Sequence, residues 1–304
     1  MKCVNLYFSN ICILHKQEVT YLNKFKENLL TKGIDLNIKH FGIGYPQRLS
    51  EYLSKDDCIL PDVIISTDLE IYEDKSIYSK FSNSLYPLIN YFDIKPDIKN
   101  STIYYDDRLL PFIIIPLVFC YNTNYIGNTN SILEVIQNSD KTIIGGINNS
   151  GAKSIIKAIW SKYGKDIATQ FLENTQIMNM PIQAFNAVKK GSDRLSIVPL
   201  IYAKTANNKD LFMSYPKDGA IALPSYVCAS KSLDTTTMLT VLSELLSEDF
   251  CNSFVKSGSL VSSLSNTADE TTSLANNYKF IYPDTTWFDN TSSDEFYQLF
   301  KKYL

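Results

Sequence analysis

Hydroxyl, amide and carboxylate side chains follow several apolar runs of this chain, at positions where predicted strands end. Such groups donate and accept hydrogen bonds and fix the orientation of a small polar ligand. The same residue types also cap helices, each contributing about 1 kcal/mol, so a single one does not identify a site. Their occurrence at several strand ends favours ligand binding. The candidate ligand-binding residues are Ser9, Asn10, Ser66, Thr67, Asp68, Tyr121, Asn148, Asn149, Ser150 and Tyr202.

The segment 146–154 combines glycines, asparagines and a lysine, as phosphate-binding loops do. A nucleotide-binding P-loop requires its lysine directly after the second glycine, whereas Ala152 separates Gly151 from Lys153 here. We therefore expect no nucleoside triphosphate site. A helix is predicted to begin near Ser150, and the N–H groups of a first helical turn favour a carboxylate, a phosphate or another oxyanion.

The chain is poorly equipped for catalysis. It has two histidines, His15 and His40, and none of the G-x-S-x-G, H-E-x-x-H or G-x-G-x-x-G motifs. Asp68, Glu70 and the triplet 106–108 could supply catalytic carboxylates, but charged loop residues are usually only solvated. The six cysteines form no C-x-x-C pair. We expect no enzymatic activity and no cofactor.

Alternating strands and helices position these side chains. Residues 3–8, 35–40 and 61–66 are predicted strands, and residues 16–31 and 45–54 are predicted helices. The run 61–66 is almost continuously apolar, which is typical of a strand buried on both faces of a parallel sheet. The fold class is therefore α/β, and the carboxyl ends of the strands form the edge at which such sheets bind ligands.

A second α/β region follows the long apolar segment 110–122, which suits a strand that runs between two lobes. Strands are predicted at 142–145 and 195–202, and the intervening residues show the pattern of helices. The chain of 304 residues exceeds the usual size of a single core, which also favours two lobes.

The amino-acid composition limits the kinds of partner that this chain is expected to bind. Hydrophobic residues make up 45% of the chain, enough for a large core, and the formal net charge is −3. The lysines are spread along the sequence, so the basic patch that attracts nucleic acid is missing. We expect a monomer that binds a small molecule or an ion and no nucleic acid.

The amino-terminal residues 1–7 enter a strand pattern directly, without the apolar core of a signal peptide. As the sequence is written, we expect a cytoplasmic protein. If a signal was removed, the protein is instead extracytoplasmic and associated with the membrane.

Four segments in a fixed order carry a resemblance to a known family. They read LPDVIISTD at 60–68, IPLVFCYNTN at 115–124, FNAVKKG at 185–191 leading to IVPLIYA at 197–203, and YPKDGAIALP at 215–224. In this order they resemble the solute-binding proteins of ABC importers, in the branch of ferric, thiamine and phosphonate binders. The resemblance covers nearly the whole chain.

The resemblance implies a periplasmic binding protein of type II, in which two crossing strands join two doubly wound lobes and the ligand cleft lies between them. Lobe 1 would comprise residues 1–114 and 222–304, and lobe 2 residues 115–221. A hinge in the crossings at 113–118 and 219–224 would close the lobes. The implied function is capture of a small ligand, anionic or metal-bound, for an ABC importer, whose permease would be the partner of an exported chain.

Other roles occur on the same fold, since fold alone does not settle function. The type II fold is also found in enzymes of tetrapyrrole and thiamine-precursor synthesis and in effector domains of transcription factors. A cytosolic ligand sensor or a cofactor-precursor enzyme is therefore the alternative.

A metal ligand is less well supported by the resemblance. Ferric binders of this class hold iron with a pair of tyrosines beside a histidine and a carboxylate, but Tyr202 is followed by Ala203. His15 follows the first strand, where such proteins can carry their histidine, yet a lone histidine near a helix start is more often a surface residue. His15 and Tyr202 are the weak candidates for a metal site.

Overall fold

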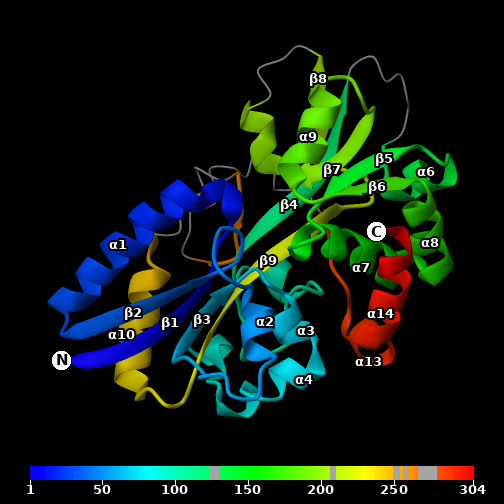
Figure 1. Ribbon diagram of the computed structural model, residues 1–304. Helices are drawn as coiled ribbons and strands as arrows, with labels where there is room; N and C mark the ends of the chain where they lie inside the picture. Colours follow the sequence, from blue (N-terminus) through cyan, green and yellow to red (C-terminus); the bar gives the residue numbers. More distant parts are fainter. Residues whose placement is uncertain (123–129, 206–209, 249–253, 256–258, 266–278) are drawn as a thin grey trace. The chain divides into compact units, whose positions relative to one another are not determined.

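The computed structural model describes residues 1–122, 130–205, 210–248, 254–255, 259–265 and 279–304, and Figure 1 traces its helices and strands. Thr123 and Asn124, which end the second family-like segment, lie outside these ranges. The chain divides into two compact units. Unit 1 consists of Met1–Ile114 and Pro224–Thr271, and unit 2 of Ile115–Leu223 and Thr272–Leu304. Among the helices of the described ranges, none combines the length and hydropathy of a membrane span.

The sheet of unit 1 is built on three parallel strands in the order β2-β1-β3. They are β1 (Lys2–Ser9), β2 (Ile34–Phe41) and β3 (Val63–Ser66). All four residues of β3 are buried, as the apolar run predicts for a strand covered on both faces. β9 (Ala220–Ala229) is antiparallel to β3, and β10 (Val261–Ser262) pairs with the first half of β4 (Leu110–Asn122).

The helices of unit 1 cover this sheet. α1 (His15–Thr31) buries an apolar stripe that includes Leu22, Phe25 and Leu29, spaced as one face of a helix requires. It packs against α10 (Thr235–Leu245), where the Tyr21 hydroxyl donates to the Leu245 carbonyl at 3.1 Å. The shorter helices are η1 (Cys12–Leu14), α2 (Leu49–Leu53), α3 (Glu70–Glu73), α4 (Lys75–Tyr78), η2 (Ser82–Ser84), η3 (Leu88–Asn90) and α5 (Pro96–Lys99).

The sheet of unit 2 also has a parallel core, in the order β7-β5-β6. These strands are β5 (Thr142–Gly145), β6 (Thr175–Met178) and β7 (Leu195–Pro199). The second half of β4 is antiparallel to β7 and to β8 (Leu211–Ser214), and β11 (Phe280–Ile281) is parallel to the first residues of β9. Its helices are α6 (Ile132–Gln137), α7 (Ser150–Tyr163), α8 (Lys165–Glu173), α9 (Pro181–Lys189), η4 (Leu200–Thr205), α13 (Thr285–Asn290), α14 (Ser293–Phe300) and η5 (Lys301–Tyr303).

Two strands belong to both units. β4 passes from unit 1 to unit 2 between Ile114 and Ile115, and β9 returns between Leu223 and Pro224. The crossings expected from the sequence lie at 114/115 and 221/222. The alternation of strands and helices in each unit confirms the predicted α/β class.

The carboxyl-terminal helices differ from the expectation. All of 222–304 is expected in lobe 1, but α13 and α14 group with unit 2. There Trp287 and Phe296 pack against Trp160 of α7, with ring centroids 6.0 and 6.4 Å away. An amphipathic helix shows in its sequence which of its faces is apolar but not which surface that face will cover.

Candidate functional site

The carboxyl edge of the unit 1 sheet gathers five of the predicted ligand-binding residues. Ser9 is the last residue of β1 and Ser66 the last of β3, and both are buried. Asn10 continues from β1, and its N–H donates to the carbonyl of Phe41 at the end of β2, at 3.0 Å. Because the three strands are parallel, Ser9 and Asn10 lie at the same edge as the segment 66–68.

Asp68 and Ser66 hold the local backbone. The buried Asp68 carboxylate accepts the backbone N–H of Ser50 at 2.8 Å, in the first turn of α2. The Asp68 N–H in turn donates to the Ser66 hydroxyl at 2.9 Å. Ser66 and Asp68 therefore have the capping role that is the alternative to ligand contact, because each accepts a hydrogen bond from a neighbouring N–H group.

Replacing Asp68 with alanine is expected to lower the free energy of unfolding by about 1–3 kcal/mol, because the buried N–H of Ser50 loses its acceptor. Urea titration followed by circular dichroism measures this. The matched control is Asp74→Ala, which removes an exposed cap bond to the Ser76 N–H and should cost about 1 kcal/mol or less. If Asp68→Ala is as stable as the wild type, the carboxylate has no structural role, and ligand contact becomes the better explanation for Asp68.

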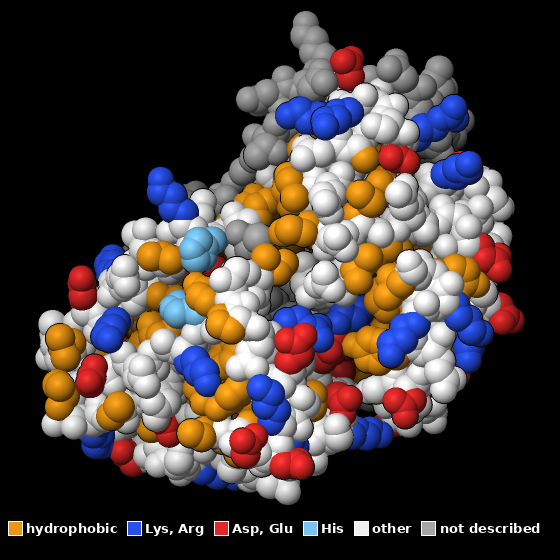
Figure 2. Space-filling view, viewed as in Figure 1, with side chains coloured by type: hydrophobic (Ala, Val, Ile, Leu, Met, Phe, Trp, Pro, Cys, Tyr) orange, Lys and Arg blue, Asp and Glu red, His pale blue; other side chains and the backbone are white. Residues whose placement is uncertain are grey.

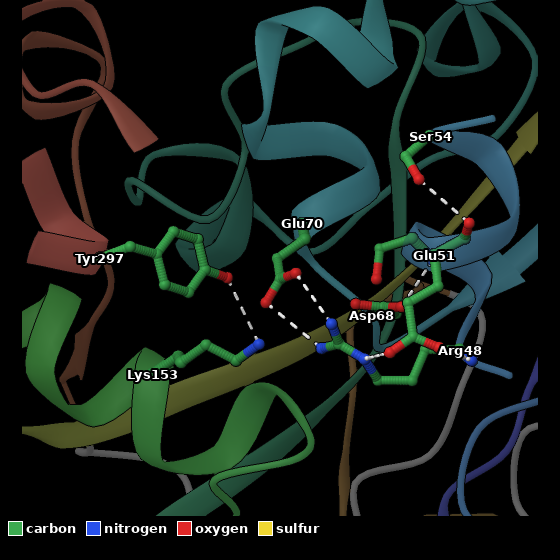
Figure 3. Close-up of polar contacts among 8 residues, drawn as sticks. Arg48, Glu51, Ser54, Asp68, Glu70, Lys153 and Tyr297 are labelled. Atoms are coloured by element: carbon green, nitrogen blue, oxygen red, sulfur yellow. Dashed lines mark hydrogen bonds and ion pairs between the residues drawn. The ribbon is translucent and has the colours of Figure 1, made fainter. Parts of the chain in front are cut away.

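Arg48 organises the carboxylates beside this edge (Figure 3). Its guanidinium bonds Glu51 at 3.0 Å and reaches both carboxylate oxygens of Glu70 at 3.4 Å. Glu70, considered above for carboxylate catalysis, is thus held by an arginine that favours its charged form. Sequence reasoning missed Arg48, although the Arg48 to Glu51 spacing of three residues at a helix start is a recognisable local signal.

Both histidines of the chain lie around Tyr45 in unit 1. The ring of His40 stacks on Tyr45 with centroids 5.3 Å apart, and the His15 ring lies 6.3 Å from Tyr45. Figure 2 shows both histidines, in pale blue, at the surface. Burial and the nearby His15 lower the pKa of His40. Within the ranges that the structure describes, no group of three or more His, Cys, Asp or Glu side chains is arranged to hold a metal ion.

The carboxyl edge of unit 2 is formed by the ends of β5, β6 and β7, which are parallel. The three polar residues 148–150 follow β5. Asn148 is exposed, Asn149 caps α7 by accepting the Gly151 N–H at 2.7 Å, and Ser150 is the buried first residue of that helix. The predicted helix start at Ser150 is confirmed.

At this edge, Gly145 allows the starts of α7 and α9 to lie close together. A Cβ on Gly145 would lie 2.4 Å from the Met180 carbonyl oxygen and 2.5 Å from Pro181 Cα, so only glycine fits there. α7 and α9 therefore begin beside one another. At the α9 start the Met180 N–H donates to the Gln183 side chain at 3.0 Å, and Pro181 has no N–H to offer a ligand.

Tyr202 lies at the carboxyl edge of unit 2. The strand predicted at 195–202 ends at Pro199, and Tyr202 belongs to the short helix η4 that follows. Its buried ring stacks on Phe185 of α9 with centroids 5.1 Å apart. His15 belongs to unit 1 and Tyr202 to unit 2, and within the described part of the chain His15 is in no cluster of three or more His, Cys, Asp or Glu side chains that could hold a metal ion.

Tyr121 is not brought together with the other candidates of unit 2. In the antiparallel pairing of β4 with β7, Tyr121 lies opposite Leu195, whereas Pro199 at the carboxyl end of β7 lies opposite Leu117. The length of β7 therefore separates Tyr121 from that edge by roughly 13 Å. The reason is strand direction: β4 runs against its neighbour, so its carboxyl end lies at the opposite edge. The Tyr121 hydroxyl instead bonds the Ser214 hydroxyl of β8.

Two buried lysines of α7 were not predicted as site residues. Lys153 and Lys157 are only 4% and 8% exposed, which is rare for lysine and places two positive charges one turn apart. The Lys153 ammonium donates to the Tyr297 hydroxyl at 3.5 Å (Figure 3), and that of Lys157 lies 4.8 Å from the Phe296 ring centroid. The sequence signal was Lys153 in the incomplete P-loop pattern of segment 146–154, a pattern that does not predict a nucleoside triphosphate site.

The Asp218 carboxylate in the family-like segment 215–224 has a structural role. It accepts the N–H groups of Ile132 and Leu133 at 3.0 and 3.1 Å, at the start of α6, and the Tyr163 hydroxyl at 2.6 Å. Burial and this bond raise the pKa of Tyr163. The segment is therefore explained by the architecture of unit 2.

A sequence profile described as bacterial extracellular solute-binding protein matches residues 59–285. The chain belongs to this family. The family predicted from the order of the four segments is thus confirmed, and with it the prediction of a solute-binding role. No curated protein sequence matches this solute-binding protein.

Solved structures share the fold of this solute-binding protein over its whole length. They include iron-bound HitA from Pseudomonas aeruginosa, with a TM-score of 0.72, 14% identity and coverage of 100% of this chain and 99% of that one. FutA from Trichodesmium, in complex with iron and citrate, has a TM-score of 0.70, 15% identity and 99% coverage of both chains. AfuA from Actinobacillus pleuropneumoniae, with fructose-6-phosphate bound, has a TM-score of 0.68, 18% identity and coverage of 100% and 98%. The predicted fold of two lobes joined by crossing strands is confirmed by these similarities.

Proposed function

We propose that this solute-binding protein captures a small anionic solute between its two units and passes it to the permease of an ABC importer. Membership of the extracellular solute-binding family is the observation that carries the proposal. The carboxyl edges of the two parallel sheets support it, because each presents predicted polar residues where α/β sheets bind ligands. In this proposal unit 1 contributes Ser9 and Thr67, and unit 2 contributes Asn148, Ser150 and Tyr202.

The start of α7 supports an anionic ligand. The backbone N–H groups and the dipole of a helix N-terminus favour negative charge, by about 0.3–1 kcal/mol for a single exposed group. Lys153 and Lys157 add two formal positive charges to the same helix. A phosphate ester or a carboxylate matches this combination better than a cation does.

A bare ferric ion is less well supported than an anion. Tyr202 is followed by Ala203, so the tyrosine pair of ferric binders is missing at this position. The chelate of a metal with an organic acid remains compatible with the proposal, since its outer surface is anionic.

The remaining parts of the proposal follow from the family. Binding without chemical conversion is expected of a binding protein, and the family description is that of extracellular proteins, which supports the extracytoplasmic alternative over the cytoplasmic expectation. We further propose that the protein acts as a monomer, that nucleic acid is not a partner, and that a hinge in β4 and β9 closes the units around the solute.

A thermal-shift screen of phosphate esters, citrate, phosphonates, amino acids, thiamine-like compounds and ferric salts tests the proposal. A true solute present at a hundred times its Kd should add about 2.7 kcal/mol to the free energy of unfolding, which raises Tm. Small-angle X-ray scattering with that solute should show a smaller radius of gyration, because the closed state binds better. Stabilisation by neutral or cationic compounds alone would reject the anionic class, and conversion of the bound compound would reject a binding protein.

A further inference from the structure

Two buried oxygen atoms at the carboxyl edge of unit 1 have no hydrogen-bond partner among the described residues. They are Glu18 Oε2 on α1 and Asn10 Oδ1 after β1. Glu18 is 1% exposed, an unusual burial for a carboxyl group. An ionised carboxylate and an amide oxygen are both acceptors, so neither can satisfy the other as long as both remain acceptors.

The Glu18 side chain is connected to the Asn10 segment through the backbone N–H of Ile11. The other oxygen of the same carboxyl, Glu18 Oε1, accepts the backbone N–H of Ile11 at 2.7 Å. Ile11 directly follows Asn10, so the Glu18 carboxyl lies against the backbone that carries the Asn10 side chain. The orientation of the Asn10 amide is fixed from its other end, because Nδ2 donates to the Ile43 carbonyl at 3.0 Å.

Among the described residues, no donor reaches Asn10 Oδ1. This oxygen lies 2.2 Å from the position that a Cβ on Gly42 would occupy, so it faces the α-carbon of that glycine. A C–H group is at best a weak donor. The Asn10 N–H is used by the Phe41 carbonyl and the Ile11 N–H by Glu18.

We propose that Glu18 is a protonated positioning residue, whose carboxyl keeps a hydrogen on Oε2 and donates it to Oδ1 of Asn10. One proton then satisfies both buried oxygens, and neither atom carries the cost of an unpaired buried polar group. The bond closes a chain from α1 through Glu18 and Asn10 to the Ile43 carbonyl, in the loop 42–48.

The titration of Glu18 agrees with this arrangement. Burial raises its pKa to about 8, and the Ile11 N–H opposes that rise. The titratable groups on this side of α1 are Tyr45, whose pKa is raised by its burial and by Glu18, and the two histidines around it. The ion pair of Lys32 with Glu244 lies at the far end of α1, about 21 Å along the helix.

The proton positions the loop 42–48, which carries Tyr45 against His40 and His15. Above the pKa of Glu18, two acceptors face one another, and the Asn10 amide is expected to turn so that Nδ2 donates to the carboxylate. That turn breaks the bond to the Ile43 carbonyl and releases the loop at the carboxyl edge of the sheet. The consequence for solute binding rests on the proposed function, whereas the proton itself does not.

The test uses the ligand-free full chain and the variant Glu18→Gln, whose amide mimics the protonated carboxyl. An infrared difference spectrum between wild type and variant at pH 6 should show the carbonyl stretch of a protonated carboxyl, and this band should disappear as the pH rises through about 8. A Glu18 that is ionised at pH 6 overturns the proposal. Titration of the wild type by carboxyl-labelled NMR gives the same answer without a variant.

Stability and side-chain dynamics provide the second readout. A proton held by the folded state is a stability contribution fully present below the ordinary carboxyl pKa and lost as the pH rises through about 8. Tm of the wild type should therefore fall between about pH 5 and 8, and level off above pH 8, by more than Tm of Glu18→Gln. The side-chain amide signals of Asn10 should shift around pH 8 in the wild type only. Equal pH profiles for the two proteins would reject the proposal.

Binding of fructose 6-phosphate or citrate is measured separately, at pH 7 and 9, in both proteins. The proposal expects affinity to fall at pH 9 in the wild type and to stay unchanged in Glu18→Gln. If neither probe binds at any pH, the proposed function fails for these anions while the spectroscopic result on the proton stands. If a probe binds with the same pH dependence in both proteins, the link between Glu18 and the site is rejected.

Discussion

Gly145→Ala is expected to destabilise unit 2 more than any other single substitution considered in this protein. The added Cβ would lie 2.4 Å from the Met180 carbonyl oxygen, 2.5 Å from its carbonyl carbon and 2.5 Å from Pro181 Cα, which are all backbone atoms. Backbone held between β6 and α9 cannot rotate away as a side chain can. We expect a loss of about 3 kcal/mol or more in the free energy of unfolding.

The measurement is guanidinium unfolding followed by tryptophan fluorescence. Trp160 and Trp287 both belong to unit 2, so the signal reports on the unit that carries the change. Gly191→Ala is the matched control: Gly191 also lies in unit 2 and has φ +74°, but an added Cβ would meet only Asn122 Nδ2 at 3.7 Å, so alanine there should cost only about 1–2 kcal/mol. Equal losses for the two variants would show that the close approach to Met180 is not constraining.

Gly145 also illustrates what sequence can predict about the fold. The strand at 142–145 and the helix that starts at Ser150 are local patterns, and both predictions are confirmed. The contact of Gly145 with Met180 joins residues that are far apart in the chain, and no local periodicity encodes it. The grouping of α14 with unit 2 differs from the expected lobe 1 for the same reason, because the apolar face of this helix could cover either unit.

The placement of the candidate residues at a sheet edge could be predicted as far as strand direction could be assigned. Ser9 and the segment 66–68 share an edge because their strands are parallel, which the almost continuously apolar run 61–66 indicated. Tyr121 lies away from the carboxyl edge of unit 2 because β4 is antiparallel to β7. The sequence of a single apolar strand does not show its direction relative to its neighbours. The buried Lys153 could not be predicted, since lysine is expected at the surface and its cover comes from α14, distant in sequence.

Ser150→Asp is expected to lower ligand affinity much more than stability. A carboxylate in the first turn of α7 complements the helix dipole by about 0.3–1 kcal/mol, which offsets part of the cost of placing a charge at this buried position. The same charge repels an anionic solute at close range, where two charges 4 Å apart interact by about 4 kcal/mol in a partly solvated site. We therefore expect about a tenfold to hundredfold loss of affinity, measured by calorimetry with the solute that the screen identifies.

Ser150→Asn is the matched control, because it adds similar volume to the buried position without a charge. It should retain most of the affinity. If both variants lose affinity equally, the effect is steric and the ligand need not be anionic. If Ser150→Asp binds as tightly as the wild type, the solute does not lie at the start of α7.

The division of each unit into two segments of chain has a consequence for the order of folding during synthesis. Lys2 of the first strand bonds Asp234 at the start of α10, 232 residues later, so unit 1 is completed by a late part of the chain. In unit 2, Lys153 and Tyr297 are separated by 144 residues, and α7 lacks its aromatic cover until the last helix has left the ribosome. Neither unit is a contiguous segment that can fold as it emerges, so early chain lengths expose apolar surface to chaperones.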